Sequence, residues 1–298
     1  MKKILFLSLM LSAAVAASAQ MKVAPKMQLG DLKTYVSNAT VTIPGQGTVN
    51  ISDESTITVA EVLADGFVLN LETNKVTSDA KADNIAGQLV AAAQEMMAGI
   101  SVRVATNAEG KPLRIVNYDD VQKKIDAGSD KLIDKLLQTV PQIGQMIPKE
   151  ALKAQITENA SEENLLKSLQ SQVCPLVLNG KTLMTGAQEE YVTDQGLKMK
   201  RMFFVNGKNV TTNGSMNMSR DDLKALIIKQ VEQMLPDQAD MIKQNIDQVM
   251  DSGMMKFDMK ETATYELADD GWVKSIKAES SYEAMGQNTQ TVTTVTLK

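Results

Sequence analysis

The chain has no histidine and a single cysteine among its 298 residues. Histidine has the side-chain pKa closest to neutrality and is the commonest general base and metal ligand, so its absence excludes the zinc-protease motifs and most histidine-based mechanisms. One cysteine cannot close a disulfide within the chain, and stability must come from a hydrophobic core. Because Cys174 lies between Val173 and Pro175 in an apolar stretch, we expect a buried, unreactive thiol.

Sequence motifs that carry catalysis are also missing. There is no Gly-x-Ser-x-Gly elbow, no Walker-type Gly-Lys-Ser and no Cys-x-x-Cys, and aromatic residues make up 4% of the chain, too few for sugar-stacking platforms. Pairs of adjacent acids fall at expected turns, helix starts or strand rims, where a solvated role is ordinary: Asp53-Glu54, Glu189-Glu190, Asp221-Asp222 and Asp269-Asp270. The sequence therefore predicts a protein that is not an enzyme and needs no cofactor.

Charge argues against two classes of partner. The formal net charge is −5, and loss of Lys2 and Lys3 with an export signal would make it −7. Nucleic acids and anionic lipid head groups bind clustered Lys and Arg, and no basic run is interleaved with aromatic residues here. We expect neither as a partner.

The first nineteen residues have the three parts of an export signal. Lys2 and Lys3 precede an apolar run from Ile4 to Val15, and Ala17-Ser18-Ala19 forms a small-x-small cleavage site, so we expect cleavage between Ala19 and Gln20. The run is shorter than the ~20 apolar residues that span a bilayer, and Gln20 stands where a lipoprotein would need cysteine. We expect an exported protein without a transmembrane anchor, periplasmic in the first instance, with secretion or outer-membrane association as alternatives.

The N-terminal part of the mature chain predicts an antiparallel meander. Residues 32–43 are rich in Thr and Val with strand-like alternation, residues 51–63 form a second strand, and Asp65-Gly66 predicts a hairpin into a third. Apolar residues at helical spacing follow over residues 85–97, and another hairpin is expected over residues 102–116. From Asn117, an expected helix cap, to Val173 the pattern is that of amphipathic helices divided by Pro141 and Pro148, with a capped start at Ser161.

The second half repeats this order in outline. Strands are expected at residues 176–178, 182–185, 189–193 and 197–205, followed by helices after Ser219 and after Pro236. A closing meander begins with a strand whose one face carries Phe257, Met259, Ala263, Tyr265 and Leu267 while Lys and Thr occupy the other.

These patterns predict an α+β fold. We expect antiparallel β-sheet meanders that could form a curved, half-barrel-like sheet, covered by amphipathic helices, with a loose two-fold repeat of pattern. The expected divisions are a signal peptide (1–19), a β-rich half with one helix (20–118), a helical middle (119–173) and an α+β half (174–298). Whether the halves form one sheet or two lobes, and the oligomeric state, stay open at this point.

Turn and strand patterns carry a resemblance. The signal ends in Ala-Ser-Ala-Gln, a leading strand follows Gly30-Asp31, a hairpin with an acid-Gly turn spans Val102 to Tyr118, and a meander closes the chain after Met254. In these features the chain resembles exported proteins of unknown function from Bacteroidota, a resemblance that implies no catalytic residue. A fold-level similarity to the half-barrels of periplasmic lipoprotein and lipid carriers implies an apolar cavity between a bent sheet and its covering helices.

The sequence thus favours a non-enzymatic exported protein that binds an apolar ligand, a lipid or lipoprotein, or another protein of the cell envelope. Candidate residues for an apolar inner face, which could equally be packed core, are Phe257, Met259, Tyr265, Leu267, Trp272 and Ile276. The alternative is a structural or protein-interaction module with no small ligand, in which the Thr-rich strand Thr289 to Thr296 pairs at a sheet edge with a partner.

Methionine suggests a third function. The chain has 19 methionines, and thioethers are soft ligands that suit Cu(I) without histidine. Met199, Met202, Met255 and Met259 fall in strand-like sequence and are expected in the core, whereas Met216 and Met218 lie in an expected Gly-, Asn- and Ser-rich loop. No metal site is expected, and these two are the candidates if Cu(I) does bind.

Overall fold

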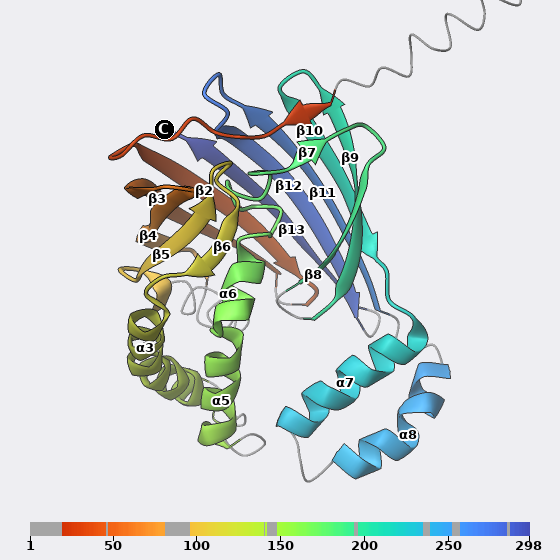
Figure 1. Ribbon diagram of the computed structural model, residues 1–298. Helices are drawn as coiled ribbons and strands as arrows, with labels where there is room; N and C mark the ends of the chain where they lie inside the picture. The colour runs from red at the N-terminus through yellow and green to blue at the C-terminus, as the bar shows by residue number, and fades with distance from the viewer. Residues whose placement is uncertain are drawn as a thin grey trace, which may run out of the picture.

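The computed structural model describes residues 20–45, 47–80, 96–139, 141, 148–193, 196–234, 239–251, 257–284 and 287–298. The fold is α+β, as predicted, and its main element is one open antiparallel sheet of 11 strands in the order β6-β5-β4-β3-β2-β13-β12-β11-β10-β9-β8 (Figure 1). The strands are β2 (Leu32–Ile43), β3 (Gly47–Leu63), β4 (Gly66–Ser78), β5 (Ser101–Asn107), β6 (Pro112–Ile115), β8 (Gln188–Val192), β9 (Lys198–Asn206), β10 (Asn209–Met216), β11 (Phe257–Leu267), β12 (Val273–Ala284) and β13 (Gln287–Leu297).

The last strand of the chain lies at the centre of this sheet, beside β2. The last strand, β13, pairs antiparallel with β12 on one side and with β2 on the other, in the register Thr293 to Ala39 and Val295 to Ser37. The two halves therefore share a single sheet. The expectation that Thr289 to Thr296 forms an exposed edge is wrong, because both edges of this strand are hydrogen-bonded; the strands at the edges of the sheet are β6 and β8.

The sheet is curved (Figure 1). Its concave face is mostly apolar and buried, whereas its convex face is more polar and exposed. In β11 the side chains of Ala263, Tyr265 and Leu267 are buried, whereas Thr262 and Thr264 between them are exposed. This alternation follows directly from the two-residue period of a strand, and it matches the face predicted for the closing meander.

A strap crosses the concave face and fills its upper part. The strap (residues 169–181) consists of successive turns, and Leu176, Val177 and Leu178 within it are almost completely buried against the sheet. The prediction of a strand over residues 176–178 is therefore wrong, because this apolar run forms turns that pack into the core. A two-stranded ribbon of β1 (Met21–Lys22) and β7 (Thr182–Leu183) continues the strap, and Val23 joins the same core.

Helices gather at the lower end of the sheet in Figure 1. They are α3 (Tyr118–Thr139), α5 (Lys149–Asn159), α6 (Glu162–Ser168), α7 (Arg220–Met234) and α8 (Ala239–Asp251). Ser161 caps α6 through Asn164 N, and Ser219 caps α7 through Asp222 N, as predicted. Asn117 behaves differently, because its side-chain oxygen accepts from the backbone of Arg103 in β5 instead of capping α3.

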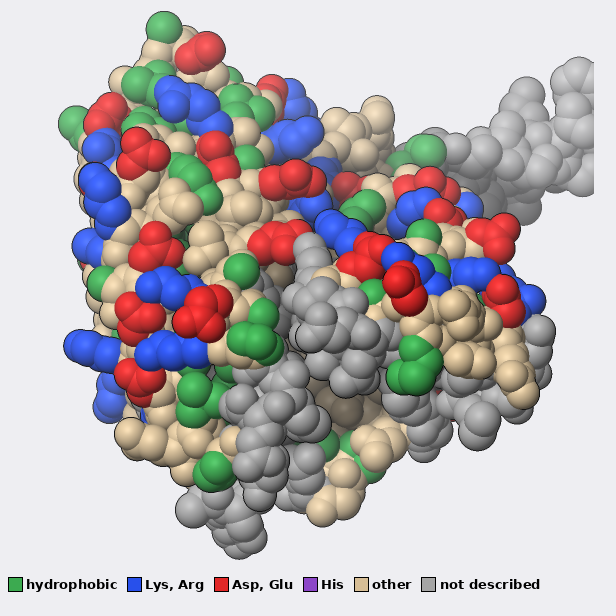
Figure 2. Space-filling model, turned by 90° about the horizontal axis from the view of Figure 1, so that it is seen from below, with side chains coloured by type: hydrophobic (Ala, Val, Ile, Leu, Met, Phe, Trp, Pro, Cys, Tyr) green, Lys and Arg blue, Asp and Glu red, His purple; other side chains and the backbone are tan. Residues whose placement is uncertain are grey.

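Seen from below, the described helices carry interspersed acidic and basic side chains, with hydrophobic ones in small groups (Figure 2). Ion pairs such as Lys149–Asp134 at 2.6 Å and Lys224–Asp247 at 2.6 Å tie neighbouring helices together. A mixed surface of this kind lacks the basic face that interfacial helices present to anionic membranes. No described helix is both long and apolar enough to cross a membrane.

The strand β10 was not predicted, and Met216 at its end was expected to lie in a loop. The helix expected over residues 85–97 falls mostly outside the described residues, of which Met96 and Met97 are helical.

The seam between β13 and β2 gives a first prediction. Val295 is 4% exposed on the concave face of β13, whereas Val292 on the convex face is 40% exposed. Val295→Asp would bury an unpaired carboxylate, and we expect it to lower the free energy of unfolding by about 4 kcal/mol or more. Val292→Asp, on the same strand, should change it by less than about 0.5 kcal/mol. Urea denaturation followed by circular dichroism measures both; equal effects would show that the seam is not buried in solution.

Candidate functional site

Two cavities lie on the concave face, on opposite sides of the strap. The β12 cavity has a volume of about 420 Å³ and is bounded by strands β8, β11, β12 and β13 together with residues 167–173. The β4 cavity has a volume of about 240 Å³ and is bounded by β3, β4 and β5 together with α6 and the start of the strap. Ser168, at the end of α6, lines both.

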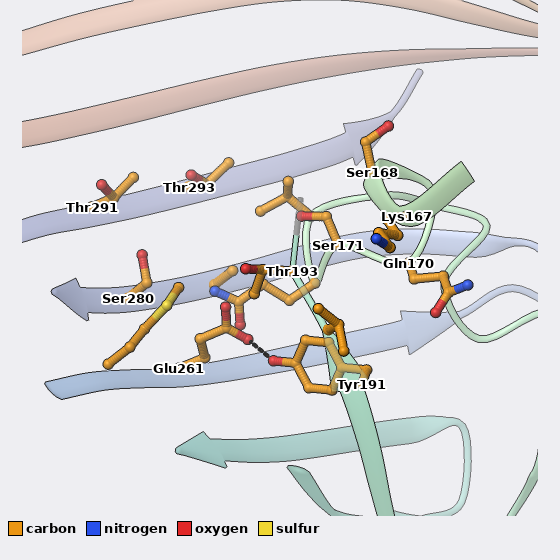
Figure 3. A pocket seen from close by; sticks show the side chains of 15 residues that line it. Lys167, Ser168, Gln170, Ser171, Tyr191, Thr193, Glu261, Ser280, Thr291 and Thr293 are labelled. Carbon is orange, nitrogen blue, oxygen red and sulfur yellow. Dashed lines mark hydrogen bonds between the residues drawn. The ribbon is translucent and has the colours of Figure 1, made fainter. Parts of the chain in front are cut away.

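The polar groups of the β12 cavity are mostly hydroxyls, with one carboxylate among them. Figure 3 shows Thr291 and Thr293 on β13, Ser280 on β12 and Glu261 on β11 projecting from neighbouring strands. Tyr191 of β8 donates a hydrogen bond of 2.5 Å to Glu261 Oε2. Apolar contact area comes from Val173, Val192, Met259 and Ala278, so the cavity combines polar groups with apolar walls.

Gly214 of β10 lies next to the pair formed by Glu261 and Tyr191. It pairs with Glu261, and a Cβ at Gly214 would make ordinary van der Waals contacts, 3.4 Å from Glu261 Cβ and 3.5 Å from Tyr191 Oη. Burial is the main cause that raises the pKa of Tyr191, and the negative charge of Glu261 adds to it, so the phenol stays protonated and donates.

The β4 cavity is mostly apolar. Side chains from three strands and from α6 converge there: Ile57, Leu71, Ile100, Val102 and Leu165. Cys174 lies in its wall, and burial raises the pKa of the thiol to about 11, so the cysteine is protonated at neutral pH. The cavity separates the main core, which contains Ile57, from the smaller core under α3, which contains Ile100.

A buried ion network holds the strap between the two cavities. Arg201 of β9 is 2% exposed, and its guanidinium carbon lies 3.9 Å from the centre of the Tyr191 ring. Its Nη2 donates to the backbone carbonyl of Gln170 in the strap at 3.2 Å. Glu189 of β8 accepts from Lys181 at 2.6 Å and lies 3.4 Å from Arg201 Nε. Burial lowers the pKa of Lys181, although Glu189 opposes this shift. Tyr265 adds a buried hydrogen bond of 2.9 Å to the carbonyl of Gln172.

A second carboxyl lies on the concave face. Asp53 of β3 shares this face with Tyr35 and Ile57 by strand alternation and pairs with Ser37 of β2. Burial raises the pKa of Asp53, and a hydrogen bond from Ser37 opposes the shift. Asp53 is thus a carboxyl for which folding disfavours the ionised form.

The residues proposed from sequence for an apolar inner face fall into two groups. Tyr265, Leu267, Trp272 and Ile276 belong to the packed core, whereas Met259 lines the β12 cavity. Phe257 is half-buried at the start of β11. Trp272 is held by its Nε1, which donates to the carbonyl of Lys26 at 3.2 Å. These side chains define the concave face, but most of them fill it.

The candidate Cu(I) ligands are less exposed than expected. Met216 is the last residue of β10 and pairs with Met199 of β9, Met218 lies in the loop that follows, and both are half-buried. No cluster of three or more Cys, Asp or Glu side chains that could hold a metal ion occurs among the described residues. Of the expected cleavage site, Ala19 lies outside the described residues, and Gln20 is the first described residue.

Sequence reasoning missed the polar residues of the site. Glu261 interrupts the apolar face of β11 between Met259 and Ala263, and this break in the alternation is the signal that could have pointed to it. Gln172 and Arg201 gave no such signal, because their burial depends on contacts between the strap and strands that are distant in sequence.

Comparisons with known proteins give little more. No family model and no curated protein matches the chain, so the resemblance to a Bacteroidota family finds no support there. Among solved structures, a lipovitellin structure described for its lipid-protein interactions aligns at a TM-score of 0.42 and 10% identity, over 92% of this chain and 25% of that one. The chain therefore spans about a quarter of the length of that protein.

Two further structures align less well. DynF of the dynemicin pathway of Micromonospora chersina has a TM-score of 0.20 and 8% identity, over 95% of this chain and 85% of that one. A porin-like protein from Bacteroides uniformis has a TM-score of 0.18 and 11% identity, over 91% of this chain and 97% of that one. At these scores, none of the three indicates a function for this chain.

The ion network predicts an asymmetric response to mutation of two adjacent acids. Glu189→Ala would leave Lys181 and Arg201 without their shared anion, and we expect a loss of about 3 kcal/mol in unfolding free energy, the lower range for a broken buried pair. Glu190→Ala, whose side chain is on the exposed face of the same strand, is the matched control and should cost little. Denaturant unfolding measures the difference, and similar values for the two variants would contradict the network.

Asp53 predicts a pH-dependent gain in stability. The folded-state pKa of Asp53 is raised, so its ionisation destabilises the fold above that pKa and has no effect below the unfolded value of 3.8. Asp53→Asn should therefore raise the melting temperature at pH 7 by roughly 1–3 °C, a small change because water still screens the half-buried site. The gain should disappear as the pH falls towards 3.8. Glu54→Gln, on the convex face and paired with Lys298, should not show this gain.

Proposed function

We propose that this chain is an exported binding protein that holds an apolar or amphipathic ligand in the concave face of its sheet. The β4 cavity carries the proposal. About 240 Å³ of space, partly open to solvent, lies here beside the apolar side chains of two core clusters. Apolar surface of a ligand that enters this space is removed from water, which favours binding.

The adjoining β12 cavity extends the same surface. Its volume of about 420 Å³ falls within the range of about 300–1,000 Å³ typical of small-molecule sites. Burying a methylene group yields about 0.8 kcal/mol, so a chain of ten would gain roughly 8 kcal/mol before the costs of association. A single alkyl chain is therefore enough for useful affinity.

Function as a binding protein and not as a catalyst agrees with the chemistry of the walls. The titratable groups that line the β12 cavity are Glu261, Tyr191 and Lys167. Tyr191 donates a hydrogen bond to Glu261, and Lys167 forms an ion pair of 2.7 Å with Glu163. The export signal expected from the sequence supports a location in the periplasm or outside the cell, where transfer or storage of a poorly soluble molecule would be useful.

A fluorescent alkyl probe tests the proposal. Val102 lies in the wall of the β4 cavity, and Val102→Phe should fill it and weaken binding about tenfold or more, equal to about 1.4 kcal/mol. Val292→Phe adds the same volume on the convex face and should leave binding unchanged. Circular dichroism checks that both variants fold, and Leu169→Phe, from the strap side of the cavity, repeats the test independently.

Native mass spectrometry of the chain from Gln20 onward, purified without detergent, gives the complementary result. Lipid-sized adducts that are lost on denaturation support the proposal. A clean apo mass, with no probe binding, would sink it and favour the alternative, a protein-interaction module. The open edges of β6 and β8, the two outer strands of the sheet, would then be the surfaces to examine by cross-linking.

A further inference from the structure

The residues that separate the two cavities are weakly packed. They comprise α6 and the first part of the strap, which together form the cover segment (residues 162–175). No residue of α6 is buried, and Gln172 is the only buried residue of 169–175, all of which are described. The chain on either side is fixed, because Ala160 belongs to the smaller core and Leu176, which is 1% exposed, belongs to the main core.

The two cavities account for this weak packing. Ser168, Gln170 and Ser171 of the cover segment lie beside the β12 cavity (Figure 3). Leu165, Ser168 and Leu169 line the β4 cavity. Both flanks of the segment thus border open space, and few apolar contacts are typical of segments that open locally. Beneath the segment, β2 is the one strand between β13, which lines the first cavity, and β3, which lines the second.

Backbone hydrogen bonds hold the cover segment together but do not join it to the sheet. The amides of Gln170, Ser171 and Cys174 each donate to the carbonyl three residues earlier, at 2.9, 3.1 and 3.0 Å. Among the described residues, no bond between backbone groups links the segment to a strand. Its attachments to the sheet use side chains, as where Glu162 Oε1 accepts from the amide of Ile115 in β6 at 2.9 Å. The segment can therefore move without breaking its own turns.

The contact of the cover segment with β9 and β11 is incompletely hydrogen-bonded. Arg201 Nη2 and Tyr265 Oη donate to the carbonyls of Gln170 and Gln172. Three buried atoms at this contact have no hydrogen-bond partner in the described part of the chain: Gln172 Oε1 and the Nε and Nη1 of Arg201, although Nε lies 3.4 Å from Glu189 Oε2. Such atoms lose their hydration without compensation. Opening lets water reach them, which lowers its cost in free energy.

We propose that the cover segment opens as a unit while the sheet and residues 176–181 stay in place, and that opening joins the β12 and β4 cavities into one elongated ligand site. The segment turns about its fixed ends at Ala160 and Leu176 and breaks its contacts with Arg201 and Tyr265. The two volumes, of about 420 Å³ and about 240 Å³, then serve one ligand that lies beneath the segment. The role in ligand entry rests on the proposed function, whereas the opening itself does not.

Hydrogen exchange followed by mass spectrometry, on the mature chain from Gln20 onward, tests the opening. Relative to their intrinsic rates, amides of residues 162–175 should exchange at least about tenfold faster than those of β12. Tyr265→Phe removes a donor to the segment and should raise its exchange about tenfold more, which corresponds to about 1.4 kcal/mol. Tyr35→Phe is the matched control, because Tyr35 is 1% exposed and donates a bond of the same length, 2.9 Å, to the carbonyl of Val273 outside the segment. It should leave exchange of the segment unchanged.

A second variant acts in the opposite direction. Gln172→Met replaces the unpartnered amide by an apolar side chain of similar length, so it should favour the closed state and slow exchange of the segment several-fold. Circular dichroism checks that each variant folds, and exchange that Gln172→Met does not slow would contradict the proposal if Tyr265→Phe is unfolded. Equal effects of Tyr265→Phe and Tyr35→Phe, or a segment that exchanges as slowly as β12, would overturn it, because exchange would then need global unfolding.

Stopped-flow binding of a fluorescent alkyl probe tests the role in entry. If ligand enters the open state, the association rate follows its population. The rate should rise about tenfold in Tyr265→Phe, fall several-fold in Gln172→Met and stay unchanged in Tyr35→Phe. An association rate that does not follow the exchange rates would overturn the role of the cover segment in entry. Exchange as expected with no binding of the probe to any variant would overturn the proposed function and leave the opening intact.

Discussion

An antiparallel sheet that curves but does not close must cover one apolar face by other means. In this chain the pairing of β13 with β2 joins the strands of the N-terminal and C-terminal halves into a continuous concave surface, and that surface needs a partner along its whole length. The strap and the N-terminal residues cover its upper part with Leu176, Val177, Leu178 and Val23. Among the described residues, the start of the strap and α6 cover the lower part, and the cavities lie there.

Hydrogen bonds from polar side chains hold the strap in place, because its turns do not pair with the strands of the sheet. Successive turns offer no ladder of backbone hydrogen bonds, so the strap depends on side chains from the sheet beneath it. Tyr265 and Arg201 donate to the carbonyls of Gln172 and Gln170, and Lys181 at the far end is bound to Glu189. A buried arginine in an apolar sheet face is costly by itself, which makes its pairing with Glu189 a condition for keeping the strap in place.

Local patterns predicted those parts of the fold whose two faces differ in polarity. The meander from β11 to β13 and the hairpin of β5 and β6 could be read from alternation and turn residues, and the caps at Ser161 and Ser219 from their side chains. The strand β10 was missed because Thr212 and Gly214 face the core where a pattern would require apolar residues. The run 176–178 was predicted as a strand because a short apolar segment has the same sequence pattern in a buried strand and in buried turns. The pairing of β13 with β2 joins residues about as far apart as the chain allows, and no local pattern encodes it.

The same reasoning explains why an apolar inner face could be predicted from the sequence, whereas the cavities on that face could not. An apolar face on the closing meander was visible, yet its largest side chains, Tyr265 and Trp272, fill space instead of bounding it. The space that remains is set by the strap, whose residues line both cavities and whose conformation no periodicity describes. Changes in the strap can therefore alter the volume and polarity of the site while the eleven strands, held by their own ladders and core, stay as they are. Selectivity for a ligand then resides in about a dozen residues of irregular backbone laid across a regular sheet, where loops of other folds also carry their function.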